Sequence, residues 1–331
     1  MPRATLDRLP DVIFTCETLR FLKLNLPGNV LTLPNAISLI NLQTLHLVSM
    51  SFGDDNVIWE LLSSCPKLEN LRINNCSMLG MNILSICSNE LQNLAITYCQ
   101  TISTVELKLS APKLQSFRYR CPLPLKFSLE NMHSLSNVDI DFHGSLYFVK
   151  KDKDLATRTV KILHGLDNVR TLILSARCIE YLSAALDLLG NFSWKLNNVS
   201  HLDLTLWYHK SYIKVLTSLF KCCSAVEFLC VGVDYLKTVP VTDEELGRRS
   251  RTAVPKCPLL KLKTVMLRQL GGINKLDLVR FLVKNADVLE KIITVSKDGV
   301  IKERTVQWIK NGAHSPVITA KEQLKLIANA N

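Results

Sequence analysis

The stretch that decides the fold is Leu68-Glu69-Asn70-Leu71-Arg72-Ile73, because its pattern of apolar residues returns along most of the chain. The same Leu-x-x-Leu-x-Leu pattern stands at Leu42–Leu47 before it and at Leu91–Ile96 after it. Its last two apolar residues are two positions apart, so a β-strand would point both side chains to the same side. A unit this short cannot bury its apolar edge alone, and we therefore expect neighbouring copies to stack.

Successive copies of this pattern recur at a nearly fixed interval. The early copies start 23, 26, 23, 23 and 21 residues apart, and the later copies start 34, 30, 27 and 36 residues apart. The early intervals fall within the roughly 20–29 residues of a leucine-rich repeat, whereas the later ones leave room for insertions or whole helices. The copies start at Leu19, Leu42, Leu68, Leu91, Leu114, Leu135, Val169, Val199, Val226 and Leu262, and Leu289–Ile292 begins a further one.

These intervals predict an α/β fold, a leucine-rich-repeat solenoid with a curved parallel β-sheet on its concave face and helices and turns outside. We expect outer helices at Asp54–Ser64, where Asp54 or Asp55 would cap the helix, at Ile179–Leu189 and at Lys214–Phe220. A bundle of amphipathic helices is the alternative, because Leu-x-x-Leu also fits a helix. The Thr, Asn, Val and Ile residues in the copies, and the Pro and Gly residues between them, favour the solenoid.

The chain carries a formal net charge of +11 over 331 residues. Such an excess favours acidic partners, nucleic acid included, but it does not bear on the fold. The densest basic clusters are Lys150–Lys151–Lys153 and Arg248–Arg249–Arg251. Each cluster is either a solvated loop or a nucleic-acid patch, and the second also resembles a nuclear-import signal.

The 11 cysteines include no Cys-x-x-Cys pair, and the first residues contain no apolar signal segment. No uncharged apolar run approaches the roughly 18 residues that span a bilayer. We therefore expect a cytoplasmic or nuclear protein with no membrane contact. Enzyme motifs and metal-ligand spacings are absent from the sequence. The sequence accordingly predicts no catalytic residue, no cofactor and no metal, and a chain that is not an enzyme.

Several phrases carry a family resemblance. Leu9–Leu19, Cys65–Leu71, Ala111–Leu114 and above all Cys257–Lys291 closely resemble segments of the plant F-box/leucine-rich-repeat/FBD family. The resemblance covers residues 9–295, and the FBD-like stretch within it implies a strand, a Gly turn, a helix at Lys275–Asn285 and a further strand. It implies a solenoid over residues 1–250, an FBD-like module over 251–295 and a divergent tail over 296–331.

The resemblance implies a protein-interaction module, similar to the substrate-recognition part of an F-box ubiquitin-ligase receptor. Family members usually begin with an F-box, a helical module that docks the Skp-type adaptor of a cullin ligase. No F-box precedes Leu9, so binding of a Skp-type adaptor is not expected. Two alternatives stay open: an F-box-less fragment or remnant with no ligase link, and a basic binder of nucleic acid or acidic ligands. Of these ligands, nucleic acid is the less favoured.

The strand residues that point away from the core should line the concave face, where repeat proteins bind their partners. They are basic over the first five copies and acidic at the sixth. We predict that a partner with an acidic stretch docks on Lys23, Arg72, Arg118 and Arg120. The alternative is that these are solvated strand residues, with Arg118 paired to Asp139 on the neighbouring strand. The full set of candidate contact residues is Lys23, His46, Arg72, Arg118, Arg120, Asp139 and Asp141.

Two cysteines have a structural interpretation. Cys76 and Cys99 each stand three residues past the last Ile of a copy. Leucine-rich repeats place Asn or Cys there, and the side chain then bonds to the backbone of the turn. We therefore expect these thiols to hold the repeat together and not to serve redox or metal chemistry.

Overall fold

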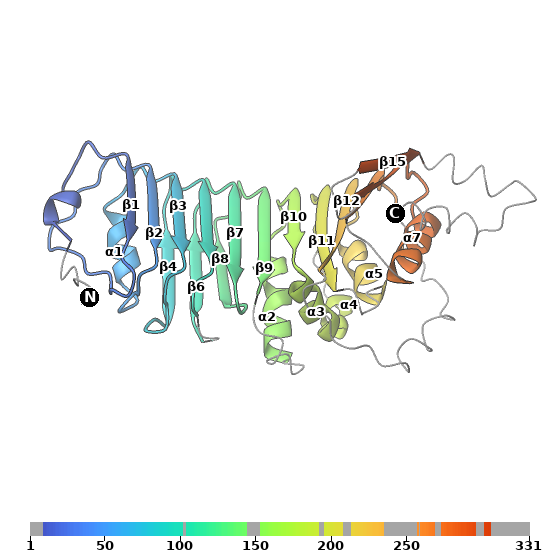
Figure 1. The fold of residues 1–331 in the computed structure, drawn as a ribbon, viewed down its shortest axis with the longest axis horizontal. Coiled ribbons are helices and arrows are strands. Elements are labelled where there is room, and N and C mark those ends of the chain that lie inside the picture. Colours follow the sequence, from blue (N-terminus) through green and yellow to red (C-terminus); the bar gives the residue numbers. More distant parts are fainter. Residues whose placement is uncertain are drawn as a thin grey trace, which may run out of the picture. The chain divides into compact units, whose positions relative to one another are not determined.

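The computed structural model describes residues 9–101, 104–143, 153–191, 195–207, 213–234, 257, 259–268, 273–295 and 301–305. The chain forms two compact units, Met1–Val169 and Arg170–Asn331. Both contain the parallel strands that the repeated pattern predicts, which Figure 1 labels in chain order. The solenoid expected from the sequence is confirmed within each unit.

The first unit has a front sheet built from the early copies of the pattern. Its strands follow the order β1-β2-β3-β5-β7-β9, and each pairs with the next in parallel. The copies stack in register, so that Leu71 lies between Leu45 and Leu94. These strands are β1 (Phe21–Asn25), β2 (Thr44–Val48), β3 (Asn70–Asn74), β5 (Asn93–Thr97), β7 (Ser116–Cys121) and β9 (Asn137–Phe142).

Alternation along each front strand separates the core from the open face, which is the face of the front sheet that points away from the core. In β3 the side chains of Leu71 and Ile73 are fully buried while Arg72 is exposed. The first leucine of the copy, Leu68, is buried as well. Burial of each such side chain stabilises the fold by roughly 1.5–3 kcal/mol. The three-leucine pattern is therefore the core itself, repeated once in every coil.

The back of the first unit contains a second sheet. Strands β4 (Ile83–Cys87), β6 (Glu106–Ser110) and β8 (Lys126–Glu130) form a three-stranded parallel sheet in the order β4-β6-β8. The expectation of turns or helices between the copies was wrong for these coils. A coil of 21 to 23 residues holds two short strands and their turns, and a strand advances about 3.3 Å per residue where a helix advances 1.5 Å.

The helix predicted at Asp54–Ser64 is α1 (Val57–Ser63), and it buries Val57, Ile58, Leu61 and Leu62. Asp54 is the aspartate at its start, because its Oδ1 accepts the backbone N–H groups of Asn56 and Val57. The neighbouring Asp55 binds the next coil instead.

The Oδ1 atom of Asp55 accepts the N–H groups of Asn82 at 2.6 Å and Ile83 at 3.0 Å. The bond from Ile83 is the main cause of the lowered pKa of Asp55. The first unit also contains the short 3₁₀ helix η1 (Asp11–Ile13) and the helix α2 (Lys153–His164).

The corners that follow front strands β2, β3 and β5 explain the positions of Cys76 and Cys99. Ser49, Asn75 and Tyr98 follow β2, β3 and β5, and all three have left-handed backbone with φ of 55°, 53° and 58°. The thiol of Cys76 donates to the carbonyl oxygens of Asn74 and, one coil back, Leu47. The thiol of Cys99 makes the equivalent two bonds. Both cysteines are thus structural, as predicted.

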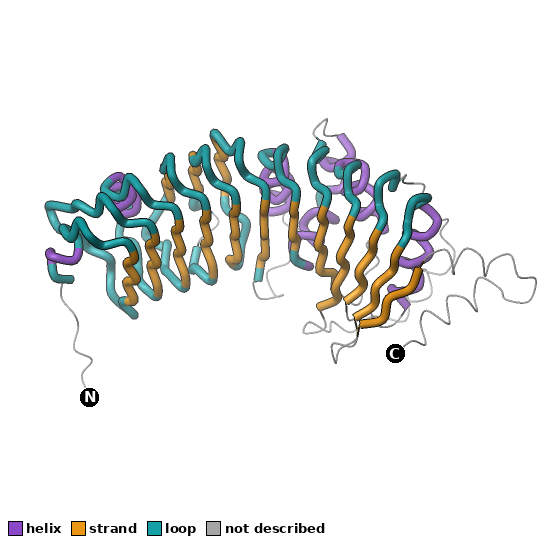
Figure 2. Tube along the Cα trace, turned by 90° about the horizontal axis from the view of Figure 1, so that it is seen from above, coloured by secondary structure: helices purple, strands orange, loops and turns teal. Residues whose placement is uncertain are grey.

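The second unit keeps the front strands but has helices behind them, and Figure 2 shows these helices on one side of the strands. The parallel strands are β10 (Thr171–Leu174), β11 (His201–Trp207), β12 (Phe228–Asp234), β13 (Thr264–Arg268) and β14 (Lys291–Val295), and β15 (Ile301–Thr305) pairs antiparallel with β14. The helices are α3 (Ala176–Ala184), α4 (Leu186–Asn191), α5 (Ile213–Cys222) and α7 (Ile273–Asn285).

The sequence predicted these helices with small errors of extent. The single helix expected at Ile179–Leu189 is divided at Ala185, whose φ of −115° and ψ of 30° end α3. The expected strand–helix–strand order of the FBD-like stretch appears as β13, α7 and β14. The Gly turn before α7, and the tail apart from β15, lie outside the described residues. Within the described part of the chain, no helix combines the length and the apolar character that crossing a membrane requires.

Candidate functional site

The in-register strands of the first unit align the predicted contact residues into one row on the open face. Lys23 lies opposite His46, and His46 opposite Arg72. Arg72 lies opposite Ala95, and Ala95 opposite Arg118. Neighbouring strands are about 4.8 Å apart, so the row runs across the sheet with one side chain per strand. We call these five residues the cationic row.

A shallow depression of about 290 Å³ follows the cationic row. The outward residues one step further along the strands complete its lining, namely Val48, Asn74 and Thr97. These three are not among the contact residues predicted from the sequence. Their position two residues after a member of the row was the available signal, because residues i and i+2 of a strand share a face.

The basic end of the row has no acidic neighbour to neutralise it. Lys23 and Arg72 are exposed, and neither forms an ion pair with any of the residues that the structure describes. His46 between them is partly buried, and its ring meets that of Phe21 edge to face with centroids 5.1 Å apart. Burial, and after it the charges of Arg72 and Lys23, hold the pKa of His46 below its usual 6.5. The imidazole is therefore mainly neutral at pH 7.

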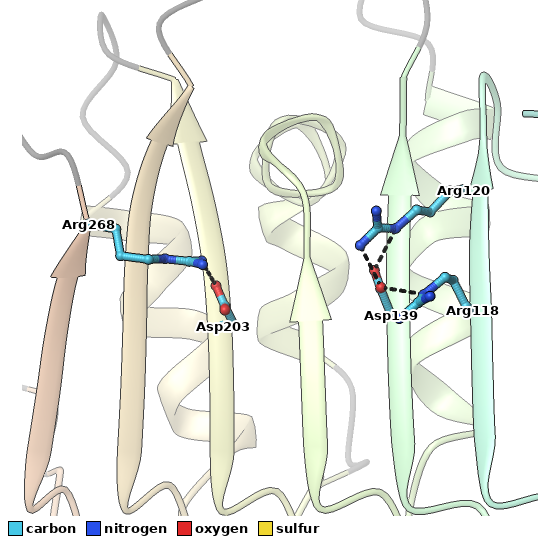
Figure 3. A network of polar contacts seen from close by, with 5 residues as sticks. All are labelled: Arg118, Arg120, Asp139, Asp203 and Arg268. Carbon is cyan, nitrogen blue, oxygen red and sulfur yellow. Dashed lines mark hydrogen bonds and ion pairs between the residues drawn. The ribbon is translucent and has the colours of Figure 1, made fainter. Parts of the chain in front are cut away.

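The other end of the row is organised by one carboxylate. The side chain of Asp139 is only 9% exposed, and it accepts hydrogen bonds from Arg118 Nε at 2.9 Å and from Arg120 Nη2 at 2.8 Å. Figure 3 shows the carboxylate of Asp139 between the two guanidinium groups. The hydrogen bond from Arg120 to Asp139 raises the pKa of Arg120 above its ordinary value. The pairing of Arg118 with Asp139, posed as the alternative interpretation, is thus present.

This arrangement divides the predicted candidate residues into two groups. Lys23, His46, Arg72 and Arg118 line the depression. Arg120, Asp139 and Asp141 lie outside its lining, with Asp141 in register with Arg120. Asp139 is buried and therefore acts as a support for two arginines and not as an acidic patch on the surface.

The second unit presents a different open face. The residues equivalent to the cationic row are Ile173, Asp203, Cys230 and Met266. Asp203 accepts a hydrogen bond from Arg268, whose side chain crosses β12 beside Gly232 to reach it (Figure 3). Burial and the nearby Asp203 carboxylate raise the pKa of the Cys230 thiol to about 11.

Metal chemistry finds no support in the described part of the chain, where no group of three or more His, Cys, Asp or Glu side chains could hold an ion. Of the basic cluster Lys150–Lys151–Lys153, the structure describes only Lys153. The cluster Arg248–Arg249–Arg251 lies outside the described residues. The described part of the first unit presents a shallow cationic depression on a parallel sheet, a surface that suits binding.

Known plant proteins are similar in sequence to this chain over most of its length. In Arabidopsis thaliana, the putative F-box/FBD/LRR-repeat protein At1g66290 is 28% identical over 88% of this chain and 62% of its own length. F-box/FBD/LRR-repeat protein At1g78750 is 27% identical over 90% of this chain and 64% of its own. F-box/LRR-repeat protein 13 is 26% identical over 90% and 65%. The chain therefore spans less than two thirds of the length of these relatives.

The family model described as the At1g61320/AtMIF1 leucine-rich-repeat domain matches residues 16–320. This match takes in the strands of both units and agrees with the parallel, in-register coils described above. A leucine-rich-repeat domain is a non-catalytic interaction module, so the prediction that the chain is not an enzyme agrees with its family. The chain belongs to the At1g61320/AtMIF1 leucine-rich-repeat family and is distantly related to the plant F-box/FBD/LRR-repeat proteins.

Proposed function

We propose that the chain is a protein-binding module that captures an acidic segment of its partner along the cationic row. The observation that carries this proposal is the position of Lys23, Arg72 and Arg118 in one depression. Two of these cations have no counter-ion among the described residues, and the third is held in place by Asp139. The bond to Asp139 orients Arg118 before binding, so this side chain loses less conformational freedom when a ligand binds, which favours affinity.

The shape of the site favours an extended ligand. The row crosses five neighbouring strands in register, so a bound chain could run across the sheet and meet one side chain at each strand. Positive charge along such a path accelerates encounter with an acidic segment and rejects basic ones. Aromatic anchors are absent from the lining of the depression, so we expect moderate affinity and a marked dependence on ionic strength.

We further propose that the captured protein is presented to a ubiquitin ligase. The similarity to proteins named F-box/FBD/LRR-repeat proteins supports this role. The chain spans 62% and 64% of those relatives, and the link to a ligase would reside in the part of them that it does not match. Co-purification of the chain with a Skp-type adaptor, compared with a fusion that adds an F-box at Met1, tests this part separately. Adaptor binding only by the fusion is the expected result.

Charge reversal tests the binding site itself. The chain with Arg72→Glu and Arg118→Glu should lose capture of acidic peptides by about 100-fold, because each reversal replaces an attraction with a repulsion. Lys108→Glu is the matched control, since this exposed cation lies on β6 of the back sheet. Peptide capture is measured at one fixed salt concentration. If the double variant binds acidic peptides as well as the control does, the proposal fails.

Nucleic acid is the second candidate ligand, favoured by the net charge of +11. A nucleic-acid backbone would engage many dispersed cations, so affinity would fall steeply and linearly on a log–log plot against salt. Binding of labelled oligonucleotides by the wild-type chain and by the Arg72→Glu, Arg118→Glu variant separates the two candidates. Equal and strongly salt-dependent oligonucleotide binding by both would favour nucleic acid held elsewhere on the surface.

A further inference from the structure

One position interrupts the cationic row. Ala95 lies on β5 between Arg72 on β3 and Arg118 on β7. The strands that carry the two arginines are two spacings apart, or about 10 Å. Alanine is the smallest member of the row, so it leaves a slot between two long cationic side chains. We call this slot, with Ala95 as its floor, the Ala95 slot.

Three side chains with hydrogen-bond donors, Arg72, Thr97 and Arg118, line the same depression as Ala95. Arg72 forms no ion pair with any described residue, so its guanidinium is available. Arg118 bonds Asp139 through Nε alone, which leaves its terminal N–H groups for a ligand while Asp139 fixes its orientation. Thr97, two residues after Ala95, lines the same depression.

The hydroxyl of Thr97 is oriented by its neighbour. Its oxygen accepts a hydrogen bond from Asn74 Nδ2 at 2.7 Å. The Thr97 hydroxyl donates to no other described residue in the structure, so its own hydrogen is available to an acceptor in the slot. Two arginines and one hydroxyl thus line, together with Ala95, a depression whose lining contains no acidic side chain.

We propose that the Ala95 slot binds a phosphorylated side chain of the partner, as the specific contact within the acidic segment; this inference rests on the proposed function. A phosphate monoester carries a charge of −1.5 to −2 and three terminal oxygens. Arg72 and Arg118 bind two of these oxygens from opposite sides, and the Thr97 hydroxyl donates to the third. Arginine suits this role because its planar fork of N–H donors matches phosphate geometry.

A carboxylate fills the same slot less completely. It has a single charge and two oxygens against the roughly −1.5 to −2 charge and three terminal oxygens of a phosphate monoester, so it offers less charge and one acceptor atom fewer to the two arginines and the Thr97 hydroxyl. The site therefore distinguishes phosphoserine or phosphothreonine from aspartate and glutamate. Phosphorylation of the partner would then switch its capture on, within a segment that the rest of the cationic row already attracts.

The test uses the full chain and an array of short acidic peptides whose central residue is serine, phosphoserine or glutamate. The phosphoserine peptides should bind about tenfold more tightly than their glutamate counterparts, which corresponds to one additional charge-assisted hydrogen bond. Ala95→Leu fills the slot without changing charge and should bring this ratio close to one. Thr97→Val should reduce the ratio about threefold, because it removes one donor and keeps the shape.

Ser85→Leu is the matched control, since it adds the same side chain to β4 of the back sheet. Thermal unfolding of each variant confirms that the chain is folded. A phosphoserine preference that Ala95→Leu leaves unchanged, or the absence of any preference in the wild-type chain, would overturn the inference. Acidic peptides that bind without a phosphoserine preference would leave the proposed function standing, whereas failure of every peptide to bind would remove both.

Discussion

The two units of the chain share the same pattern of front strands, but they differ in the elements that lie behind these strands and in the side chains of the open face. In the first unit five coils are 21 to 26 residues long and most of their backs are short strands, whereas its last coil, 34 residues long, contains the helix α2. In the second unit the coils are 27 to 36 residues long, and the backs that the structure describes are helices. The front strands pair in parallel and in register in both units. The apolar pattern therefore fixes the front, and coil length decides the back.

The open faces differ as much as the backs do. The first unit displays a row of cations of which only Arg118 is paired to a described acid. At the equivalent positions the second unit has the partly buried Ile173 and Met266 and the buried Cys230, and its Asp203 is bonded to Arg268. Exposed outward residues such as Lys23 and Arg72 do not contribute to the shared core, so they can vary at little cost to the fold. We therefore propose the acidic-segment function for the first unit alone.

The largest expected effect tests whether the units are independent. Leu71→Ala in the first unit and Leu229→Ala in the second each empty a fully buried position and should each cost about 3 kcal/mol of stability. Because each coil contacts mainly its neighbours, the loss of protection should concentrate in the unit that carries the change. Hydrogen exchange measured by mass spectrometry reads both units at once. Equal loss of protection throughout the chain would show that the units fold as one.

The next effect compares the two aspartates of the open faces. Asp139→Asn leaves two arginines without their carboxylate and should cost about 1–2 kcal/mol, a value reduced because Arg118 is 55% exposed. Asp203→Asn replaces the carboxylate that pairs with Arg268 and should cost about 0.5–1 kcal/mol, since Asp203 is itself 26% exposed. Urea unfolding of the two variants gives both values. A larger cost for Asp203→Asn would reverse this ranking of the two supports.

A third comparison concerns two glycines. Gly28 in the first unit has a φ of +77°, so Gly28→Ala should cost about 1 kcal/mol through backbone strain, although nothing lies within 4 Å of the added Cβ. A Cβ at Gly232 in the second unit would meet Arg268 Nε at an ordinary 3.6 Å. Gly232→Ala should therefore change stability by less than about 0.5 kcal/mol. Thermal denaturation measures the loss of stability in each variant, and equal losses in the two variants would contradict this reasoning.

The smallest effect is the pH dependence of binding. The pKa of His46 lies below 6.5, so the imidazole is neutral at pH 7 and gains a charge only on acidification. Affinity for a glutamate-rich peptide should then rise by about threefold as the pH falls below 6.5, because the peptide carboxylates stay ionised. Peptide titrations at successive pH values measure this rise. His46→Asn should abolish it, and a rise that persists in this variant would assign it to another group.

Acidification affects the stability of the free chain in the opposite direction from peptide affinity. The unfolded chain takes up a proton at His46 near pH 6.5, before the folded chain does, so acidification below that value weakens the folded state. A bound acidic peptide should offset part of this loss, since it stabilises the charged imidazole. Thermal unfolding with and without peptide, at pH 7 and below pH 6, measures the offset.

The sequence by itself determined the front of the molecule. Three apolar residues at fixed positions in each copy specify a strand, the face of it that is buried and the stacking of one copy on the next, because burial of that edge dominates the free energy of folding. The outward residues followed from the same alternation, which is why the cationic row could be predicted as Lys23, His46, Arg72 and Arg118. The roles of Cys76 and Cys99 followed from their fixed distance to the strand.

Only the tertiary structure decided what lies across strands and behind them. The back sheet of β4, β6 and β8 forms by pairing between coils, and the short alternation at Leu84 and Ile86 indicates a strand only when a partner is beside it. The support of two arginines by Asp139, and the slot above Ala95, depend on the register of residues 19 to 23 positions apart. Local sequence fixes which way a side chain points, whereas packing between coils fixes which side chains meet.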